Sequence, residues 1–325
     1  MAVTIPRFGT PDVLTIDRVP DPTPGPLHLL VQVRAFGINR ADALQRAGKY
    51  PPPRGESDIP GLELAGEVLA CGSAVTNFTP GDRVFGLVGS GAYAEKALLD
   101  QRLAIRIPES WGFAEAAAVA EVYCTANETV FGRGDLKNEE SILVHAGGSG
   151  VGTTAIQMAK YVGATVYFTA GSDEKIEKVM ALDADAGINY KTQDFVEETK
   201  RLTNGIGVDV IEDFIGASYI RKNISLLKPD GRLVLLGLMG GSKSEFDLAP
   251  ILGRRLNIRG FTLRSQAIEL KQAIVARFKE RWLPLLVNGT VRAIVHAVYP
   301  FEETAEAHRV MESNENFGKL VVIIN

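Results

Sequence analysis

Cysteine and histidine are scarce in this chain, whose 325 residues include only Cys71, Cys124 and four histidines. Two cysteines cannot build a disulfide framework, and they fit a reducing compartment. The cysteines form no cluster, and the histidines lack the spacing of metal ligands along the sequence. The composition therefore argues against a disulfide-stabilised secreted domain and against a zinc site built from these residues.

Long apolar runs and basic runs are also missing. No apolar stretch reaches the ~20 residues that a membrane-spanning helix needs. The first residues, MAVTIPRFGTPDVL, lack the apolar core of a signal peptide. The formal net charge is -4 and no Lys/Arg run occurs, so we expect neither a membrane nor a nucleic-acid partner. The composition, 46% hydrophobic and 23% charged, is typical of a soluble globular protein, and we expect a cytoplasmic one.

The most informative stretch that is present is SILVHAGGSGVG, residues 141–152. Ser141–His145 predicts a buried strand, a glycine-rich turn follows, and a helix is predicted to begin near Val151. Glycines let the backbone approach a ligand closely, and a helix N-terminus favours a pyrophosphate. A second strand, Thr165–Thr169, follows at the distance expected of a β-α-β unit. This pattern predicts a dinucleotide-binding turn.

The turn departs from the strict G-x-G-x-x-G fingerprint. Gly147 and Gly152 take the outer positions, Ser149 takes the middle one, and Gly150 follows it. We predict that these four residues and Val151 bind the cofactor. The alternative is an ordinary tight turn from a strand into a helix.

The turn after the second strand indicates which of the two nicotinamide cofactors, NADH or NADPH, the protein binds. An NAD site has an acidic residue about 20 positions beyond the glycines, and here Ala170 and Gly171 stand in its place. Ser172 and Lys175 offer a hydroxyl and a positive charge to a 2′-phosphate, and Tyr190 could close the other side. We therefore predict NADPH as the cofactor.

This prediction has an alternative, in which Lys175 is a solvated helix residue and Tyr190 a packing aromatic. Asp173 and Glu174 lie close to the predicted phosphate site and argue against it unless they point outward.

The chain predicts two domains of different composition. Its first third, rich in proline, glycine and short alternating segments, predicts a mainly β domain with barrel-like closure. Its middle alternates strands and helices, which predicts a doubly wound parallel sheet. We place the β-rich catalytic domain at residues 1–117 and 266–325 and the cofactor domain at residues 118–265. The terminal GKLVVIIN is a strand that could rejoin the first domain. Further elements expected in the middle are helices at Glu174–Leu182, Asp194–Leu202 and near Tyr219–Leu227, with strands at Gly187–Tyr190, Val208–Asp213, RLVLLG and LNIRGFTLR.

Several motifs accompany the glycine turn: FGTPDVL, GINRADALQRAGKYPPP, IPGLELAGEV, GDRVFGL, GRLVLLGLMGG and FGKLVV. Together they resemble the zinc-independent medium-chain dehydrogenases/reductases over residues 1–325. Within that family they resemble the NAD(P)H:quinone oxidoreductases of the zeta-crystallin-like group, in particular its stress-inducible branch. The resemblance implies a Rossmann domain inserted in a GroES-like domain, with the active site in the cleft between them. It also implies a homodimer formed by edge strands of the cofactor domains, for which LNIRGFTLR is the candidate.

The positions that hold zinc in zinc-dependent relatives carry other residues here. Asn39 stands at the cysteine position, and Gly61-Leu62-Glu63 replaces Gly-His-Glu. Without zinc, alcohol oxidation loses the Lewis acid that stabilises an alkoxide. Reduction of quinones and polarised alkenes depends less on such a Lewis acid, in agreement with the chemistry that the family implies.

We predict Asn39, Tyr50 and Thr125 as catalytic residues. The amide of Asn39 could donate to a substrate oxygen where charge builds, or Asn39 could simply cap a helix at Ala41–Ala47. Tyr50 could lie against a planar quinone and act as a donor or proton source, or it could anchor a proline-rich loop. Thr125 resembles the family threonine beside the nicotinamide, and its alternative is a helix-interior threonine.

Two later loops are predicted to complete the nicotinamide pocket. Leu238 and Gly240 follow a strand end, and backbone groups there could bind the carboxamide. The resemblance implies Phe261, Leu263 and Lys319 as further cofactor contacts.

The resulting prediction is an NADPH-dependent quinone oxidoreductase that transfers hydride to small quinones without a metal. One alternative is NADPH-dependent reduction of α,β-unsaturated ketones or aldehydes. A different class, an NADPH-binding scaffold or RNA-binding regulator, also stays open.

Overall fold

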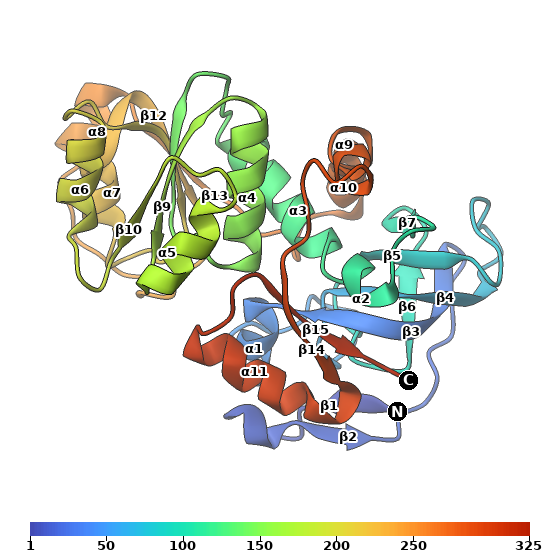
Figure 1. The fold of residues 1–325 in the computed structure, drawn as a ribbon. Coiled ribbons are helices and arrows are strands. Elements are labelled where there is room, and N and C mark those ends of the chain that lie inside the picture. The colour runs from blue at the N-terminus through green and yellow to red at the C-terminus, as the bar shows by residue number, and fades with distance from the viewer. The chain divides into compact units, whose positions relative to one another are not determined.

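The computed structural model describes residues 1–325, which form two compact units (Figure 1). Unit 1 comprises Met1–Val122 and Leu263–Asn325, and unit 2 comprises Tyr123–Thr262. The chain therefore enters unit 2 once and leaves it once, so unit 2 is an insertion in unit 1. No helix in either unit is both long and apolar enough to cross a membrane.

Unit 1 is built on a mixed sheet with the order β14-β15-β3-β4-β5-β7, in which β6 also pairs with β3. Its strands are β3 (His28–Ile38), β4 (Glu63–Cys71), β5 (Arg83–Leu87), β6 (Lys96–Asp100), β7 (Ala104–Arg106), β14 (Val295–Pro300) and β15 (Lys319–Ile323). The long β3 pairs with β6 through its first residues and with β15 through its last, which curls the sheet. The C-terminal strand therefore rejoins the first domain, as predicted. Two short strands, β1 (Ala2–Thr4) and β2 (Thr15–Asp17), form a separate ribbon.

Unit 1 also contains several helices, of which α2 (Phe113–Ala116) and α11 (Thr304–Ser313) pack on this sheet. The helices are α1 (Arg40–Arg46), α2, α9 (Ile268–Arg281), α10 (Leu283–Val287) and α11, with 3-10 turns η1 (Pro11–Val13) and η3 (Phe301–Glu303). Helix α3 (Ala120–Ala126) begins in unit 1 and continues into unit 2.

Unit 2 contains an all-parallel sheet of six strands in the order β10-β9-β8-β11-β12-β13. The strands are β8 (Ser141–Val144), β9 (Thr165–Ala170), β10 (Ala186–Asn189), β11 (Val208–Asp213), β12 (Leu227–Leu235) and β13 (Asn257–Gly260). The helices are π-helix η2 (Asn127–Arg133), α4 (Gly150–Tyr161), α5 (Asp173–Met180), α6 (Phe195–Leu202), α7 (Ile220–Leu226) and α8 (Ala249–Arg254). Numbered by chain position, the sheet order is 3-2-1-4-5-6, the Rossmann arrangement.

Both faces of this sheet are covered. On one face, Leu143 and Ile211 pack with Phe195 of α6 and Ile224 of α7. Neighbouring residues in a strand point to opposite faces, and Ile142 is also fully buried. Two-sided burial explains why these strands are continuous apolar runs.

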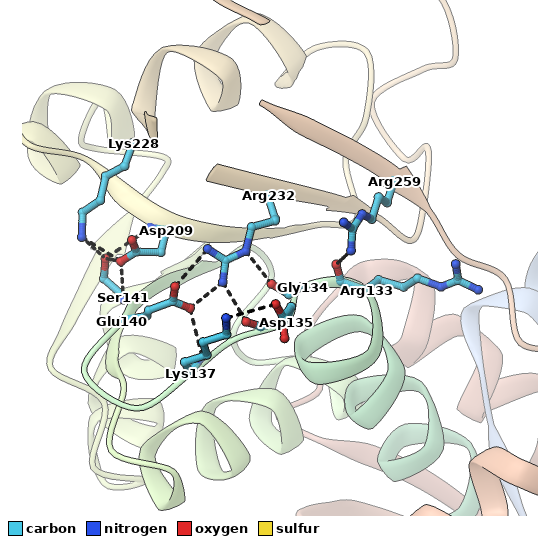
Figure 2. Close-up of polar contacts among 10 residues, drawn as sticks. All are labelled: Arg133, Gly134, Asp135, Lys137, Glu140, Ser141, Asp209, Lys228, Arg232 and Arg259. Atoms are coloured by element: carbon cyan, nitrogen blue, oxygen red, sulfur yellow. Dashed lines mark hydrogen bonds and ion pairs between the residues drawn. The ribbon is translucent and has the colours of Figure 1, made fainter. Parts of the chain in front are cut away.

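The amino ends of the strands are held together by polar contacts (Figure 2). Arg232 of β12 donates to the Glu140 carboxylate and to the carbonyl of Gly134. Lys228 lies 2.7 Å from the Asp209 carboxylate, which also accepts from Ser141. These contacts join the segments before β8 and β11 to β12.

Candidate functional site

The strand order of unit 2 reverses between β8 and β11, because the chain builds outward from β8 in both directions. In such sheets ligands bind at the carboxyl ends of the strands at this switch point. The predicted glycine turn follows β8 there, and the segment Phe214–Gly216 follows β11 beside it.

The glycine turn closes tightly on the start of α4. Ser149 caps this helix, and its Oγ accepts from the N–H of Gly152 at 3.0 Å. A Cβ on Gly152 would lie 2.4 Å from the carbonyl oxygen of Ala146 and 2.9 Å from the Cα of Gly147, so only glycine fits. The N–H groups at the start of α4 lack an intrahelical acceptor, as those of any helix do. This geometry fits a dinucleotide pyrophosphate, although the ligand contacts themselves remain a prediction.

Backbone strain marks the same turn. Ala146 has φ 51°, a left-handed conformation that non-glycine residues rarely adopt. The N–H of Gly147 donates to the Thr169 carbonyl at 2.9 Å and ties the turn to the end of β9. Strained residues of this kind often lie at ligand sites.

The second predicted turn brings its residues together at the end of β9. A Cβ on Gly171 would lie 2.6 Å from the hydroxyl oxygen of Tyr190, so the phenol lies directly against the turn. Ser172 caps α5 by accepting from the N–H of Lys175 at 3.3 Å, which leaves its own hydroxyl hydrogen available to donate. Lys175 lies in the first turn of this helix, and its contact with a 2′-phosphate remains a prediction.

The two acids that argued against NADPH have other partners. Asp173 Oδ1 accepts from the Asn189 amide at 2.7 Å. Glu174 pairs with Lys178 one helical turn along α5. Neither carboxylate is therefore committed to the position where an NAD site has its ribose-binding acid.

A chain of buried hydrogen bonds runs behind these turns. The fully buried His145 has Nδ1 3.0 Å from Thr169 Oγ1 and Nε2 2.8 Å from Asn223 Oδ1. Asn223 donates its N–H to Asp213 Oδ2 at 3.0 Å, so its Oδ1 is an acceptor and the His145 proton lies on Nε2. Burial lowers the pKa of His145 to about 4, so the ring is neutral. His145 is therefore a neutral buried residue that connects strand ends.

Asp213 completes this chain at the end of β11. Its carboxylate accepts from the N–H of Ile215 at 2.7 Å and of Gly216 at 3.2 Å, which orders the loop at the switch point. Burial raises the pKa of Asp213 to about 6 against these hydrogen bonds.

Glu212 is a second buried acid of β11. Its Oε1 lies 2.5 Å from Thr129 Oγ1, its Oε2 has no partner, and burial raises its pKa to about 8. Thr129 Oγ1 is also 3.0 Å from the Thr125 carbonyl. The Thr129 hydroxyl donates to Glu212 Oε1, and this hydrogen bond opposes the effect of burial on the pKa of Glu212. This contact supports the π-helix η2, a rare element that is frequent at functional sites.

The loop after β12 is tied to the loop after β11. Gly240 donates its N–H to the Ile215 carbonyl at 2.7 Å, so this N–H is already used. Leu238 is 57% exposed and is the part of the loop open to a ligand. The predicted carboxamide contact remains a prediction.

In unit 1, Asn39 joins β3 to α1. It is the N-cap of α1, and its backbone N–H donates to Asp42 at 2.8 Å. Its side chain donates from Nδ2 to Glu63 at 3.0 Å and accepts at Oδ1 from Lys319 at 2.8 Å. The second amide hydrogen meets only the distant carbonyl of Gly37, at 3.4 Å. Asn39 thus occupies the capping position, and its contact with a substrate remains a prediction.

Lys319 is buried in this cluster. Its ammonium contacts the Ile38 carbonyl at 2.8 Å, Asn39 Oδ1 at 2.8 Å and the Glu63 carboxylate at 2.7 Å. These three acceptors use all its hydrogens. The cofactor contact predicted for Lys319 would require the loss of one of them.

The position of α1 is set by a further buried network. Asp42 is fully buried and accepts from the Tyr93 hydroxyl at 3.0 Å, and burial raises its pKa to about 6. Tyr93 is also 3.1 Å from His308 of α11, whose pKa burial lowers to about 3, with the charge of Arg46 acting in the same direction. The network joins α1 to α11 and so fixes the start of α1 at Asn39.

Tyr50 is half-buried and anchors its loop, and its catalytic role remains a prediction. Its carbonyl accepts from Arg264 at 3.3 Å, which anchors the proline-rich loop, and the Arg264 guanidinium lies 5.3 Å from its ring centroid. Its hydroxyl makes no hydrogen bond to the protein. Burial raises the pKa of this phenol, so it keeps its proton at neutral pH and can donate.

The remaining predicted residues are divided between the units. Thr125 lies within α3 in unit 2 and is 8% exposed, which matches its helix-interior alternative. Phe261 belongs to unit 2 and Leu263 to unit 1, and each is 5% exposed. Their cofactor contacts remain predictions.

Several residues of the candidate site escaped the sequence-based reasoning. Glu63 was visible only as the last residue of a Gly-Leu-Glu triplet, and its pairing with Lys319 joins distant segments. Asn223 lies on helix α7, where polar residues are normally solvated. Only its burial reveals it.

Two known domain families match the chain. Residues 25–109 match the alcohol dehydrogenase GroES-like domain, and residues 150–280 match the zinc-binding dehydrogenase family. With the folds of the two units, these matches define a reductase of the two-domain class that binds a nicotinamide cofactor.

Individual relatives and solved structures show which members of this class the chain resembles. The human synaptic vesicle membrane protein VAT-1 homolog is 33% identical over 336 residues, covering 97% of this chain and 84% of that protein. Human quinone oxidoreductase is 29% identical over 326 residues, covering 99% and 97%. The solved structure of Escherichia coli quinone oxidoreductase complexed with NADPH superposes with a TM-score of 0.90 at 27% identity, covering 99% of each chain. CurK enoyl reductase gives a TM-score of 0.88 at 26% identity, covering 100% and 99%. The chain belongs to the zinc-independent medium-chain dehydrogenases/reductases, in the quinone oxidoreductase group.

Proposed function

We propose that this protein is an NADPH:quinone oxidoreductase that reduces small quinones without a metal. Bound NADPH would supply the hydride. The main support for NADPH as the cofactor is the turn at Gly171. The Tyr190 hydroxyl lies against this turn, and Asp173 and Glu174 have other partners. Lys175 offers the positive charge that a 2′-phosphate needs, and the turn has no acid that would favour NAD.

Two hydrogen-bond donors in unit 1 support the proposal that a quinone is the electron acceptor. The Tyr50 hydroxyl has no protein partner, and the Asn39 amide, oriented by Lys319 and Glu63, makes only a long 3.4 Å hydrogen bond to Gly37 with its second hydrogen. Donors held ready in this way stabilise the negative charge that builds on an acceptor oxygen.

The experiment is an initial-rate comparison of NADPH with NADH, using a small ortho-quinone and an enone, under argon and in air. We expect NADPH to be the better donor by about tenfold or more in kcat/KM, equal to at least 1.4 kcal/mol. Lys175→Ser should remove most of this preference, and Lys178→Ser, on the same helix, should retain it.

Other outcomes would change the assignment. Comparable efficiency with NADH would exclude the NADPH preference. Tight NADPH binding without turnover would favour the scaffold alternative, and a salt-dependent gel shift with single-stranded RNA would favour the RNA-binding regulator.

Reduction of α,β-unsaturated ketones or aldehydes is the second candidate. The free Tyr50 hydroxyl favours it, because alkene reduction needs a proton donor, and CurK enoyl reductase shares the fold. Tyr50→Phe should then lower enone reduction more than quinone reduction. Equal losses would remove Tyr50 as the proton donor.

We also propose a cytoplasmic homodimer. Strand β13 is the last of its sheet, so one of its edges is unpaired and can pair with the same edge of a second copy. Sedimentation should show a dimer that Ile258→Pro disrupts. A monomeric wild-type protein would contradict this.

A further inference from the structure

Arg264 is the centre of a hydrogen-bonded cluster in unit 1, at the base of the loop that begins with Tyr50. Its side chain is 5% exposed. Nε donates to the Gly89 carbonyl at 2.7 Å, and Nη1 donates to the Tyr50 carbonyl at 3.3 Å. Nη2 donates to Gln45 Oε1 at 2.6 Å and to Ser90 Oγ at 3.2 Å. Because all three nitrogens have acceptors, the planar guanidinium is held in one orientation.

Two of these acceptors extend the cluster to the far end of the same loop. Gln45 donates from Nε2 to the Asp58 carbonyl at 3.0 Å, so its amide oxygen is the atom that faces Arg264. Ser90 donates its hydroxyl to the Ile59 carbonyl at 2.5 Å. Arg264 therefore binds the start of the loop directly and its end through Gln45 and Ser90.

The loop between these anchors is stiff, and the ring of Tyr50 is held as well as its backbone. The loop continues with three prolines, Pro51–Pro53, whose rings fix φ at about −65°. The Arg264 guanidinium carbon lies 5.3 Å from the Tyr50 ring centroid, within the range in which a cation is attracted to an aromatic ring. Arg264 thus contacts both parts of Tyr50 that decide where its hydroxyl points.

The same contact places a positive charge beside the phenol. An arginine side chain stays protonated in proteins. Burial raises the pKa of the Tyr50 phenol, the charge of Arg264 lowers it, and the charge of Glu121 raises it by less than Arg264 lowers it. A proton donor is most effective when its pKa lies near the working pH. The guanidinium therefore acts in the direction that helps Tyr50 to give up its proton.

We propose that Arg264 is a positioning residue for Tyr50. It fixes the direction of the phenol and stabilises the negative charge that forms there when Tyr50 gives its proton to an acceptor. The proposal rests on the proposed function, and within it on enone reduction with Tyr50 as the proton donor.

The proton transfer balances as follows. A hydride from NADPH adds to the β-carbon of the enone, which leaves NADP⁺. The electron pair of the C=C bond forms a bond from the α-carbon to the proton of Tyr50, and the O–H bond breaks. The phenolate takes a proton back from water.

The first test measures the ionisation of Tyr50 without turnover. The full chain, which has eight tyrosines, is isotope-labelled at tyrosine Cζ and titrated by NMR, and Tyr50→Phe identifies the Tyr50 signal. We expect a higher Tyr50 pKa in Arg264→Gln, which removes the charge, and a value closer to the wild type in Arg264→Lys, which keeps it. Arg309→Gln, at an exposed ion pair of unit 1, is the control and should change nothing. An unchanged Tyr50 pKa in Arg264→Gln would overturn the proposal.

The second test is a double-mutant cycle on enone reduction. Arg264→Gln should lower kcat by at least about tenfold when Tyr50 is present. It should lower kcat by less than about twofold in the Tyr50→Phe background, because its effect passes through Tyr50. Arg264→Lys should recover part of the loss. A purely structural role would give equal losses in both backgrounds and would overturn the proposal.

If Arg264→Gln does not fold, the cycle is run with Arg264→Lys. Its smaller loss, which comes from the missing planar fork, should likewise vanish in the Tyr50→Phe background, and a loss that persists there would overturn the proposal. Absence of both enone and quinone reduction by the wild type would overturn the proposed function, while the NMR titration still decides whether Arg264 acts on Tyr50. Normal turnover with an unchanged Tyr50 pKa in Arg264→Gln would overturn the role of Arg264 alone.

Discussion

The two ends of the six-stranded sheet in unit 2 differ in whether their polar side chains form ion pairs. At the amino ends, Arg232 pairs with Glu140 and Lys228 with Asp209 (Figure 2), and these side chains remain 12–28% exposed. At the carboxyl ends, His145 and Glu212 are fully buried and uncharged near neutral pH. Partly solvated ion pairs hold strands together at little desolvation cost. At the carboxyl ends none of these groups forms an ion pair, and the N-terminus of α4 there favours an anion.

The pKa values follow this division. Burial alone would raise the pKa of Asp209, but Lys228 and Ser141 bind its carboxylate and the pKa is lowered. Glu212 has only Thr129 to oppose burial, and its pKa is raised to about 8. Two acids of one strand therefore differ because only one has a cation beside it.

Gly152→Ala should have the largest effect, because it fills the closest contact at the carboxyl ends. Its Cβ would lie 2.4 Å from the Ala146 carbonyl, so the turn must open. We expect NADPH to bind at least about 100-fold more weakly, a loss of roughly 2.7 kcal/mol, in a fluorescence titration. Gly253→Ala in α8, where no atom lies within 4 Å of the new Cβ, is the control and should bind normally. Unchanged affinity in Gly152→Ala would mean that the turn does not hold the cofactor.

Asn223→Leu should break the buried chain with little change of volume. It leaves the His145 Nε2–H without a partner, at a cost of about 1–3 kcal/mol, and removes one of the donors to the Asp213 carboxylate. We expect the free energy of unfolding to fall by about 2–4 kcal/mol in urea denaturation. Ser225→Leu on the exposed side of α7 should change it by less than about 0.5 kcal/mol. A similarly small effect of Asn223→Leu would show that the chain contributes nothing.

Glu212→Gln should change how stability depends on pH. The pKa of this carboxyl is 4.5 in an unfolded chain and about 8 in the folded protein, so between these values only the folded state keeps the proton. The wild type therefore loses stability as pH rises from 4.5 to 8, by up to about 1.4 kcal/mol per pH unit.

The glutamine variant lacks this proton. Its stability relative to the wild type should rise by about 2 kcal/mol between pH 6 and pH 8, measured by urea denaturation at both values. Glu140→Gln, at the amino ends, should show no such pH-dependent difference. Parallel curves for Glu212→Gln and the wild type would mean that Glu212 is ionised in the folded protein.

Arg232→Met should have the smallest effect and should act on stability alone. It removes a partly exposed pair with Glu140 and a hydrogen bond to the Gly134 carbonyl. We expect a loss of about 1–2 kcal/mol, reduced at high salt, with an unchanged dissociation constant for NADPH. A weaker affinity for NADPH would show that the two ends of the sheet are coupled.

Much of the local structure of unit 2 was predictable. Strand β11 has the predicted bounds, and most helices and strands around it differ by a residue or two at their ends, whereas β13 ends at Gly260, four residues before the predicted run LNIRGFTLR does. The main difference is β12, which begins at Leu227 instead of at Arg232 because a turn with Asp230 at φ 63° is absorbed into the strand. Periodicity predicts such elements well because each depends on neighbours in the sequence.

The candidate site was predictable only where its residues are contiguous. The glycine turn and the Gly171–Ser172 turn follow from short motifs. The contacts of Asn39 with Lys319 and Glu63, and of Arg264 with Tyr50, join segments far apart in the chain. No local pattern records which distant residues meet.

By itself, the sequence determined the alternation of strands and helices, the tight turn at Gly152 and the missing acid after β9, because each depends on local backbone geometry and on which side chains are present. The tertiary structure alone decided which polar groups lose their water. His145 and Glu212 have ordinary chemistry in an open chain. Burial makes both neutral, because desolvation depends on everything packed around a group.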